Sequence, residues 1–378
     1  MSKSYTAFIG LLFLVLSALS GCYPRNTEPF IQLSHSNGVF FYDSLKCLNG
    51  INVITGYYFV DMHGNKLLQR NADLCLTIDS QRYVGILDSN VFAMFEGDSI
   101  LWRAPVAAHH EVFVDEDNNI VTLGMEAAHI GKKNNWGMPY IVGINPSNGE
   151  IAYRKSFLPL VEQVSKWLPE SRDSIIKRNR AFFKKYMPER AFLFDTAYFH
   201  INSVQIIPPN EAEKTDTRFK KGNLLISDFM TNFMAIIERQ SFEILWLFYQ
   251  RESDLGQHSA RMQPNGNILF FLNNVRDGDK YYSAVRELNP LTGEVVWEYT
   301  GTPEKSLYSI TQGHVQPLPN GNKLITVNSE TIKGDGYVLE IDSNNTPVWK
   351  WTPPDYHQMA SKREGFYRTE RIFDMPKY

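Results

Sequence analysis

Histidines at matching positions are the residues of this chain best suited to chemistry, because an imidazole can transfer protons near neutral pH. His110 lies nine residues before Asn119, and His258 lies nine residues before Asn267. Each asparagine opens a short apolar stretch that has the composition of a strand. The two histidines therefore hold equivalent places in two structural units, and a shared polar site is the hypothesis.

The elements that must position these histidines are repeated hairpins. A phrase that joins a polar turn to a short apolar strand recurs, and its copies end at residues 69, 102, 153, 246, 297 and 349. Asn, Asp and Gly suit such turns because they tolerate positive φ. The intervals are 33, 51, 93, 51 and 52 residues, and a unit near fifty residues is typical of a four-stranded propeller blade. The sequence predicts an all-β, six-bladed β-propeller with a helical insertion between blades.

The predicted ring places three histidines together. The first strand of each blade lines the central channel of a propeller, and His200 opens a third unit as His110 and His258 open theirs. We expect these three side chains to share one cavity, although a lone histidine is more often structural. His314 lies eight residues before Asn322, one place out of register. Because a one-residue shift turns a side chain to the other face, His314 reaches the channel only where a bulge or loop re-aims it.

The insertion is predicted at residues 157–195, where the apolar periodicity becomes helical. Ser171 has the character of an N-cap for a helix over 172–186, which Met187 and Pro188 end. Its basic residues form either a solvated face or a lid that faces an anionic substrate. A dimer contact through this segment, and hence a homodimer, also stays open. The basic residues are Lys177, Arg178, Arg180, Lys184 and Lys185.

The first residues resemble a targeting signal. Lys3 precedes an apolar run over 7–19, and small residues lead to Cys22. This pattern predicts a lipoprotein signal peptide over 1–21 and a mature propeller domain over 22–378, lipidated at Cys22. The alternatives are an N-terminal anchor helix and a cleaved signal with an incidental cysteine. The prediction places the protein in the cell envelope, lipid-anchored on the periplasmic face, with the outer membrane favoured.

Two cysteines remain after Cys22. Cys47 and Cys75 flank the first repeat ending, so they are either a disulfide across the first blade or two free thiols. The formal net charge of −3 argues against nucleic acid as the main partner.

The histidine phrases carry a resemblance to a known family. They are Ala108-His109-His110-Glu111-Val112, His200-Ile201-Asn202-Ser203-Val204 and Gln257-His258-Ser259, followed by Pro264-Asn265-Gly266-Asn267 and by Arg276, and finally Tyr308-Ser309 and Val315-Gln316-Pro317-Leu318-Pro319-Asn320-Gly321-Asn322. In this order, over roughly residues 40 to 352, the chain resembles the bacterial arylsulfotransferases.

The resemblance implies a six-bladed propeller that moves a sulfuryl group from an aryl sulfate donor to a phenolic acceptor, without a nucleotide sulfate donor and with no cofactor. It implies that His200, His258 and Arg276 hold the sulfuryl group, with His110 nearby. A guanidinium offers charged, planar hydrogen-bond donors, and imidazoles donate to sulfate oxygens or carry the phenol proton.

The chain departs from the family in two respects. The arginine phrase usual before the fourth repeat ending is changed here to Asp228-Phe229-Met230-Thr231-Asn232. The covalent histidine of the family belongs near Glu330-Thr331, where this chain has none. His314, on the preceding strand, is the candidate substitute. Direct transfer, altered acceptor use and a non-catalytic, membrane-tethered binding or scaffold propeller therefore stay open. A metal or quinone-cofactor propeller is a third hypothesis, although closely spaced His or Cys ligands and paired carboxylates are missing from the sequence.

Overall fold

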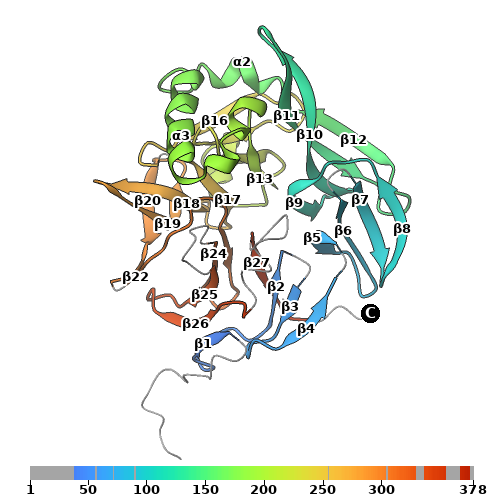
Figure 1. Cartoon of the computed structure of the whole chain (residues 1–378), viewed down its shortest axis with the longest axis vertical. Helices are drawn as coiled ribbons and strands as arrows, with labels where there is room; N and C mark the ends of the chain where they lie inside the picture. Colours follow the sequence, from blue (N-terminus) through green and yellow to red (C-terminus); the bar gives the residue numbers. More distant parts are fainter. Residues whose placement is uncertain are drawn as a thin grey trace, which may run out of the picture.

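Six antiparallel sheets stand around a central axis in the part of the chain that the computed structural model describes (Figure 1). The described residues are 38–55, 58–70, 72–88, 91–253, 255–303, 305–328, 336–354 and 367–374. The sheets are the blades of a β-propeller, which confirms the fold predicted from the repeat.

Each blade is a meander with its first strand nearest the axis. Three blades in chain order are β5 (Asp73–Thr77), β6 (Arg82–Asp88), β7 (Val91–Glu96) and β8 (Ser99–Ala104); β9 (His109–Val114), β10 (Ile120–Ile130), β11 (Lys133–Ile144) and β12 (Ile151–Ser156); and β13 (Ile201–Ile206), β14 (Leu224–Asp228), β15 (Phe233–Ile237) and β16 (Ile244–Tyr249). A fourth consists of β17 (Gln257–Met262), β18 (Ile268–Asp277), β19 (Lys280–Asn289) and β20 (Glu294–Tyr299), and a short pair, β21 (Gly301–Thr302) and β22 (Lys305–Ser306), follows it.

The two ends of the described chain close the ring. In one blade β23 (His314–Pro317), β24 (Lys323–Val327), β25 (Tyr337–Ile341) and β26 (Pro347–Trp351) gain β1 (Val39–Tyr42) as a fifth strand. In the next blade β27 (Thr369–Ile372), near the C-terminus, is the inner strand for β2 (Ile51–Ile54), β3 (Tyr58–Val60) and β4 (Lys66–Gln69). Strands from both ends of the chain are therefore needed to complete the circle.

Tryptophans in the repeated phrase connect neighbouring blades. Trp102 Nε1 in β8 donates a hydrogen bond of 2.9 Å to the carbonyl of Pro146, in the β11–β12 turn of the next blade. Trp297 in β20 donates to Asn345 Oδ1 over 3.1 Å, and Trp349 in β26 donates to the carbonyl of Met62 over 2.9 Å. Both acceptors lie in the equivalent turn of the following blade. The ring that ends the phrase thus fastens one blade to the next.

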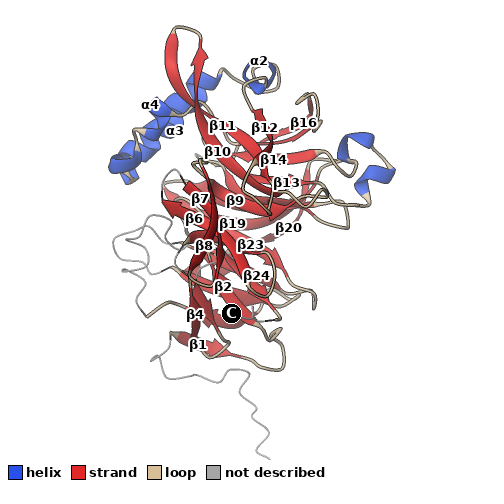
Figure 2. Cartoon of the chain, turned by 90° about the vertical axis from the view of Figure 1, so that its right-hand side faces the viewer, coloured by secondary structure: helices blue, strands red, loops and turns tan. Residues whose placement is uncertain are grey.

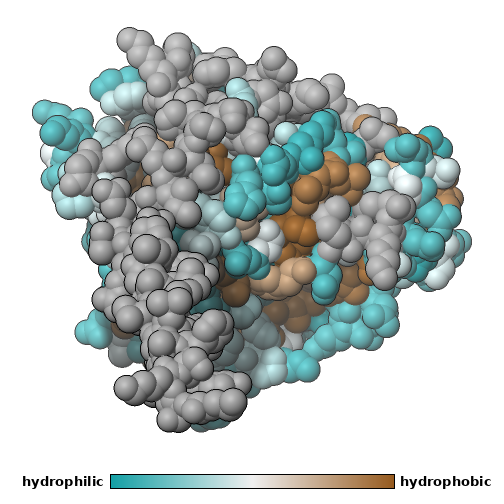
Figure 3. Space-filling model, turned by 90° about the horizontal axis from the view of Figure 1, so that it is seen from below, coloured by the Kyte–Doolittle hydropathy of each residue, from teal (hydrophilic) through white to brown (hydrophobic). Residues whose placement is uncertain are grey.

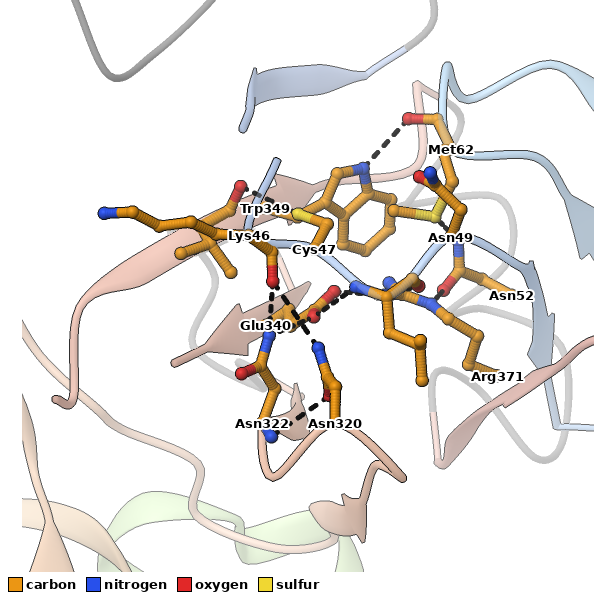
Figure 4. Close-up of polar contacts among 12 residues, drawn as sticks. Lys46, Cys47, Asn49, Asn52, Met62, Asn320, Asn322, Glu340, Trp349 and Arg371 are labelled. Atoms are coloured by element: carbon orange, nitrogen blue, oxygen red, sulfur yellow. Dashed lines mark hydrogen bonds and ion pairs between the residues drawn. The ribbon is translucent and has the colours of Figure 1, made fainter. Parts of the chain in front are cut away.

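A buried ion pair holds the closing seam (Figure 4). Arg371 of β27 pairs with Glu340 of β25, and both side chains are fully buried. Arg371 Nε also donates to Asn52 Oδ1 over 2.9 Å. Glu340 Oε1 accepts from Asn322 Nδ2 at 2.6 Å and from the backbone N–H of Leu48 at 2.9 Å. The pair thus has partners from both sides of the seam, which such burial requires, although Arg371 Nη2 is buried without a hydrogen-bond partner.

Helices occupy the predicted insertion, between β12 and β13. They are α2 (Leu160–Val164), α3 (Arg172–Tyr186), the 3₁₀ turn η2 (Pro188–Arg190) and α4 (Leu193–Thr196). Ser171 caps α3 by accepting a hydrogen bond from the backbone N–H of Ser174, as the sequence predicted. Figure 2 shows α3 and α4 on one face of the ring. Two further 3₁₀ turns, η3 (Ala212–Lys214) and η4 (Thr217–Phe219), follow β13.

The insertion is anchored by buried apolar side chains. Phe183, Met187 and Phe194 form one cluster with Phe229 and Met230 of the β14–β15 turn. Burying a large apolar side chain contributes roughly 1.5–3 kcal/mol, so these contacts hold the helices against the rim. Two basic side chains of α3 form ion pairs: Arg178 pairs with Glu170 over 2.8 Å, and Arg180 pairs with Asp195.

The disulfide alternative for Cys47 and Cys75 is wrong, because both thiols are free. Cys47 Sγ donates to the carbonyl of Val348 at 3.1 Å, and Cys75 Sγ donates to the carbonyl of Ala72 at 2.9 Å. Each thiol is thus satisfied within its own surroundings, and burial raises the pKa of Cys75 to about 12.

The predicted signal peptide over 1–21 and the lipidation site Cys22 lie outside the described residues. Among the described residues, no helix has the length and apolar character needed to cross a membrane.

Seen from below, the edge of the ring shows hydrophobic residues in the middle of a hydrophilic border (Figure 3). Phe40, Leu45 and Leu67 are among the exposed large apolar residues of the molecule.

Candidate active site

Backbone irregularities shape one rim of the channel. The inner strands β9, β13 and β17 each shift register against their neighbours near their first residues. His110 has a φ of 62° and Ser259 a φ of 59° at these places. Bulges re-aim side chains and are frequent next to active sites. They turn three histidines, from three different blades, toward each other.

His110, His200 and His258 line one cavity, as the sequence predicted. His110 Nε2 lies 2.9 Å from His200 Nε2, so a single proton between them makes a hydrogen bond. The cavity has a volume of about 130 Å³. Its lining residues are His110, Phe183, Arg190, Leu193, Phe194, His200, Phe229, Met230, His258, Thr311 and Gln312.

Asn273 fixes the tautomer of His258. The Asn273 amide nitrogen donates to the carbonyls of Ser309 and Gln312, each over 2.8 Å, so its Oδ1 is the atom that faces the imidazole. His258 Nδ1 lies 2.7 Å from this oxygen and must carry the proton to bond with it. In the neutral ring Nε2 therefore keeps a lone pair, which can accept a proton or bind an electrophile.

Burial keeps the imidazoles neutral. Desolvation lowers the pKa of His200 to about 4 and that of His258 to about 3. Desolvation, together with the neighbouring histidines, lowers the pKa of His110 well below its ordinary value. His109, whose ring lies 5.0 Å from that of His110, has its pKa lowered to about 3 by the same burial. The site is therefore an uncharged cluster of imidazoles at neutral pH.

The β14–β15 turn supports His200 and supplies apolar walls. Asp228 Oδ1 accepts a hydrogen bond of 2.6 Å from the backbone N–H of His200, and the carboxylate also accepts from Thr231. The next two residues, Phe229 and Met230, line the cavity. Phe229 lies 5.0 Å from the ring of His258, centroid to centroid. A flat aromatic substrate would meet rings on this side.

The helical insertion forms the outer wall. Phe183 of α3, Arg190 of η2, and Leu193 and Phe194 of α4 all line the cavity. The insertion is thus part of the site as well as of the surface.

The prediction that Arg276 lies in this site is wrong. Its side chain is exposed near the end of β18 and does not line the cavity. The register of β18 shifts between Leu272 and Val275, and Asn274 there has a φ of 52°. This bulge carries the rest of the strand outward, where Arg276 pairs with Tyr281 in the hairpin.

His314 lies apart from the cavity. It is buried on β23, which pairs with β24 without a register shift. Its Nδ1 shares a hydrogen bond of 2.8 Å with Ser259 Oγ, and its Nε2 is 3.9 Å from Glu370 Oε1. Beside it, Glu111 pairs with Arg261 over 2.6 Å, and Arg368 joins the same network. The structure therefore gives His314 a place in a buried charge cluster, separate from the three other histidines.

Comparison with known proteins identifies the family. A family model described as Arylsulfotransferase (ASST) matches residues 84–353, more than half of the chain. The chain belongs to the arylsulfotransferase family. No curated protein matches it.

One solved structure among those compared supports the fold. A protein of unknown function from Bacteroides caccae has a TM-score of 0.50 at 14% identity, over 81% of this chain and 94% of that one. BamB from Moraxella catarrhalis has a TM-score of 0.33 at 11% identity, over 85% and 78% of the two chains. Virginiamycin B lyase from Staphylococcus aureus has a TM-score of 0.40 at 12% identity, over 85% and 86%. At these identities only the first likeness bears on the fold, and none bears on function.

Several site residues of this arylsulfotransferase family member were missed from the sequence. Arg190 follows the predicted helix end, where only the basic run before it drew attention. Asn273 lies in a strand and carries no motif. Phe229 and Met230 lie in Asp228-Phe229-Met230-Thr231-Asn232, and this stretch differs from the arginine phrase usual in the family, which was a usable signal. Among the described residues, no group of three or more His, Cys, Asp or Glu is arranged to hold a metal ion.

Proposed function

We propose that this propeller transfers a sulfuryl group from a small aryl sulfate to a phenolic acceptor in the cell envelope. The observation that carries the proposal is the convergence of His110, His200 and His258 on one cavity with aromatic walls. Membership of the arylsulfotransferase family supplies the reaction class. The cavity is smaller than the roughly 300–1,000 Å³ typical of drug-sized ligands, so we propose donors with a single ring.

His258 is the group proposed to move the proton. Its Nε2 lone pair accepts the hydroxyl proton of the acceptor phenol as the phenol oxygen bonds to sulfur. The bond between sulfur and the donor aryl oxygen breaks, and the departing phenolate takes the proton from His258. The ring is a weak base while the cavity is empty, but a bound anion favours the protonated form and raises its pKa. The base therefore becomes effective when the donor is in place.

The negative charge of the transition state needs hydrogen-bond donors to stabilise it. Sulfuryl transfer spreads charge over equatorial oxygens, so catalysis rests on positioned hydrogen bonds and charge. Within the described structure, His110 Nδ1 is buried without a hydrogen-bond partner. Unpaired buried groups of this kind are rare and call for an explanation, and a bound sulfuryl oxygen provides one.

An exchange assay tests the function. Purified protein is incubated with 4-nitrophenyl sulfate and phenol, and the release of 4-nitrophenol is measured together with the appearance of phenyl sulfate. Wild type should form both products in equal amounts, and His258→Ala should lower the rate at least about a hundredfold, the usual scale for loss of a general base. Equal rates for wild type and His258→Ala would reject the proposed role, and no exchange by wild type would reject the activity.

The envelope location is a proposal that depends on the N-terminal pattern. Leu19-Ser20-Gly21-Cys22 supports lipidation at Cys22 and a periplasmic, membrane-tethered protein. Mass spectrometry of the mature N-terminus should find a lipidated cysteine, and Cys22→Ala should release the protein from the membrane fraction. An unmodified Cys22 in membrane-bound protein would contradict this.

A further inference from the structure

The helical insertion contributes one wall of the cavity, and the family resemblance assigned no role to the residues of this wall. The inner half of the cavity comes from the rim of the ring, through the three histidines and the β14–β15 turn. The outer half comes from residues 183–194, which lie between two blades in the sequence. The insertion thus decides what covers the histidines and which group faces them from outside.

Arg190 occupies a fixed turn in this wall. Pro188 cannot continue α3, and the chain forms η2 instead, where the backbone N–H of Arg190 donates to the carbonyl of Met187 over 3.1 Å. The residues on either side of this turn are anchored, because the rings of Phe183 and Phe194 meet edge to face at 5.1 Å and Phe183 packs 6.0 Å from Phe229. The backbone that carries Arg190 is therefore held at the cavity edge by buried rings.

Arg190 brings a positive charge to the cavity edge, where the residue is partly exposed to solvent. Among the described residues that line it, none is acidic, and Arg190 is the one with a full charge at neutral pH because the three histidines are neutral. An aryl sulfate carries one negative charge. An anion that leaves water for an apolar cavity needs a compensating partner there. A guanidinium meets this need with several donors in one plane, which suits the oxygens of a sulfate group.

We propose that Arg190 binds the sulfate group of the donor, so that the guanidinium of this active site comes from the helical insertion and not from the inner blade strands. The aryl ring then lies against Phe194 and Phe229, with the sulfur between Arg190 and the histidines. This inference rests on the proposed function for its ligand, but it concerns binding and is tested without turnover. Arg276, exposed and outside the cavity, has no part in it.

The test measures binding by isothermal titration, with phenyl sulfate and with phenol as the uncharged ring, in the absence of an acceptor. Arg190→Gln removes the charge and Arg190→Lys keeps it. Lys184→Gln is the matched control, because Lys184 is an exposed cation of α3 that does not line the cavity. Arg276→Gln is tested beside them, and circular dichroism melts establish that each variant is folded.

Arg190→Gln should weaken phenyl sulfate binding about ten- to a hundredfold, the scale of a hydrogen bond to a charged group, with phenol binding changed less than about twofold. Arg190→Lys should recover part of the loss, and the Lys184 and Arg276 variants should bind as wild type does. The proposal is overturned if Arg190→Gln binds phenyl sulfate normally, or if Arg276→Gln loses the binding instead. Wild type that binds phenyl sulfate through Arg190 but never transfers it would reject the proposed function alone.

Discussion

Asn273 Oδ1 accepts the Nδ1 proton of His258 over 2.7 Å, and this contact decides which imidazole nitrogen faces the cavity. Because the amide nitrogen of Asn273 is fixed by two loop carbonyls, the acceptor cannot exchange places with the donor. The relationship resembles the role of a buried aspartate that orients a catalytic histidine, with a neutral acceptor in place of the charge.

Asn273→Asp should change the pH dependence of transfer. A carboxylate beside Nδ1 favours the imidazolium, so the pKa of His258 rises and the low-pH limb of the kcat/KM profile moves to higher pH. Asn273→Leu should lower kcat about a hundred- to ten-thousandfold, because the tautomer is no longer fixed. The profile is measured from pH 4 to 9 with 4-nitrophenyl sulfate and phenol.

Asn274→Asp is the matched control for Asn273→Asp. Asn274 is the next residue of β18, equally buried, and donates to the carbonyl of Ile310 over 2.7 Å without a bond to His258. Both replacements place a carboxylate near the same loop, but only the Asn273 variant should shift the profile. Equal shifts in both variants would mean that the effect arises from disturbance of the loop.

Acid should destabilise the protein through its buried histidines. An unfolded histidine has a pKa near 6.5, whereas the folded pKa is about 4 for His200 and about 3 for His258. Between these values the unfolded chain binds more protons than the folded one, so stability falls as pH decreases from about 6.5. His200 alone should account for about 2 kcal/mol between pH 7 and pH 5. Urea unfolding at the two pH values measures the difference.

His200→Phe separates this effect from other titrations. The variant lacks the group, so its unfolding free energy should fall less between pH 7 and pH 5 than that of wild type. A wild-type stability that is the same at both pH values would show that the buried imidazoles become protonated without cost in the folded state.

The six-bladed propeller was predictable because each repeat is encoded by residues that are close together in the sequence. The phrase ending in Trp297 needs a turn and a terminal aromatic ring, and both are visible in the sequence. The function of that ring, a hydrogen bond to Asn345 in the next blade, follows from the repetition of blades. His110 and His258 were placed together for the same reason, since equal offsets from repeated turns put side chains at equal heights in the channel.

The failures came from features that a repeat does not encode. Arg276 was placed in the site by the family resemblance, but the register of β18 shifts at Asn274, before Arg276 is reached, and Arg276 is exposed. The position of Arg190 depends on how the insertion packs over the rim of the propeller. That packing is decided by contacts of Phe183 and Phe194 with residues distant in the sequence. Local patterns predicted the helix and its cap, and long-range packing decided what the segment after the helix faces.

Removing one charge of the buried ion pair between β25 and β27 should strongly lower the free energy of unfolding. Glu340→Ala leaves Arg371 buried without its partner, and a broken buried pair costs about 3–5 kcal/mol. Urea unfolding should show this loss. Glu211→Ala, which breaks the exposed pair with Lys214, should change stability by at most about 1 kcal/mol. A small effect of Glu340→Ala would mean that water or a nearby acceptor replaces the carboxylate.

The small volume of the cavity should limit the donor to one ring. Leu193 is a half-buried member of its outer wall, so Leu193→Ala enlarges the space without emptying the core of the insertion. The ratio of kcat/KM for 2-naphthyl sulfate to that for phenyl sulfate should rise about tenfold, since a few methylene groups in a pocket change discrimination on this scale. Both rates are measured with the same phenolic acceptor.

Phe192→Ala is the control for this change. Phe192 is the neighbour of Leu193 but is 58% exposed and does not line the cavity, so the same insertion loses an apolar side chain away from the site. Its selectivity should equal that of wild type. Wild type that uses 2-naphthyl sulfate and phenyl sulfate equally well would contradict the size limit, because a wall that moves aside during binding does not select by size. The Leu193 variant should then show no gain in selectivity.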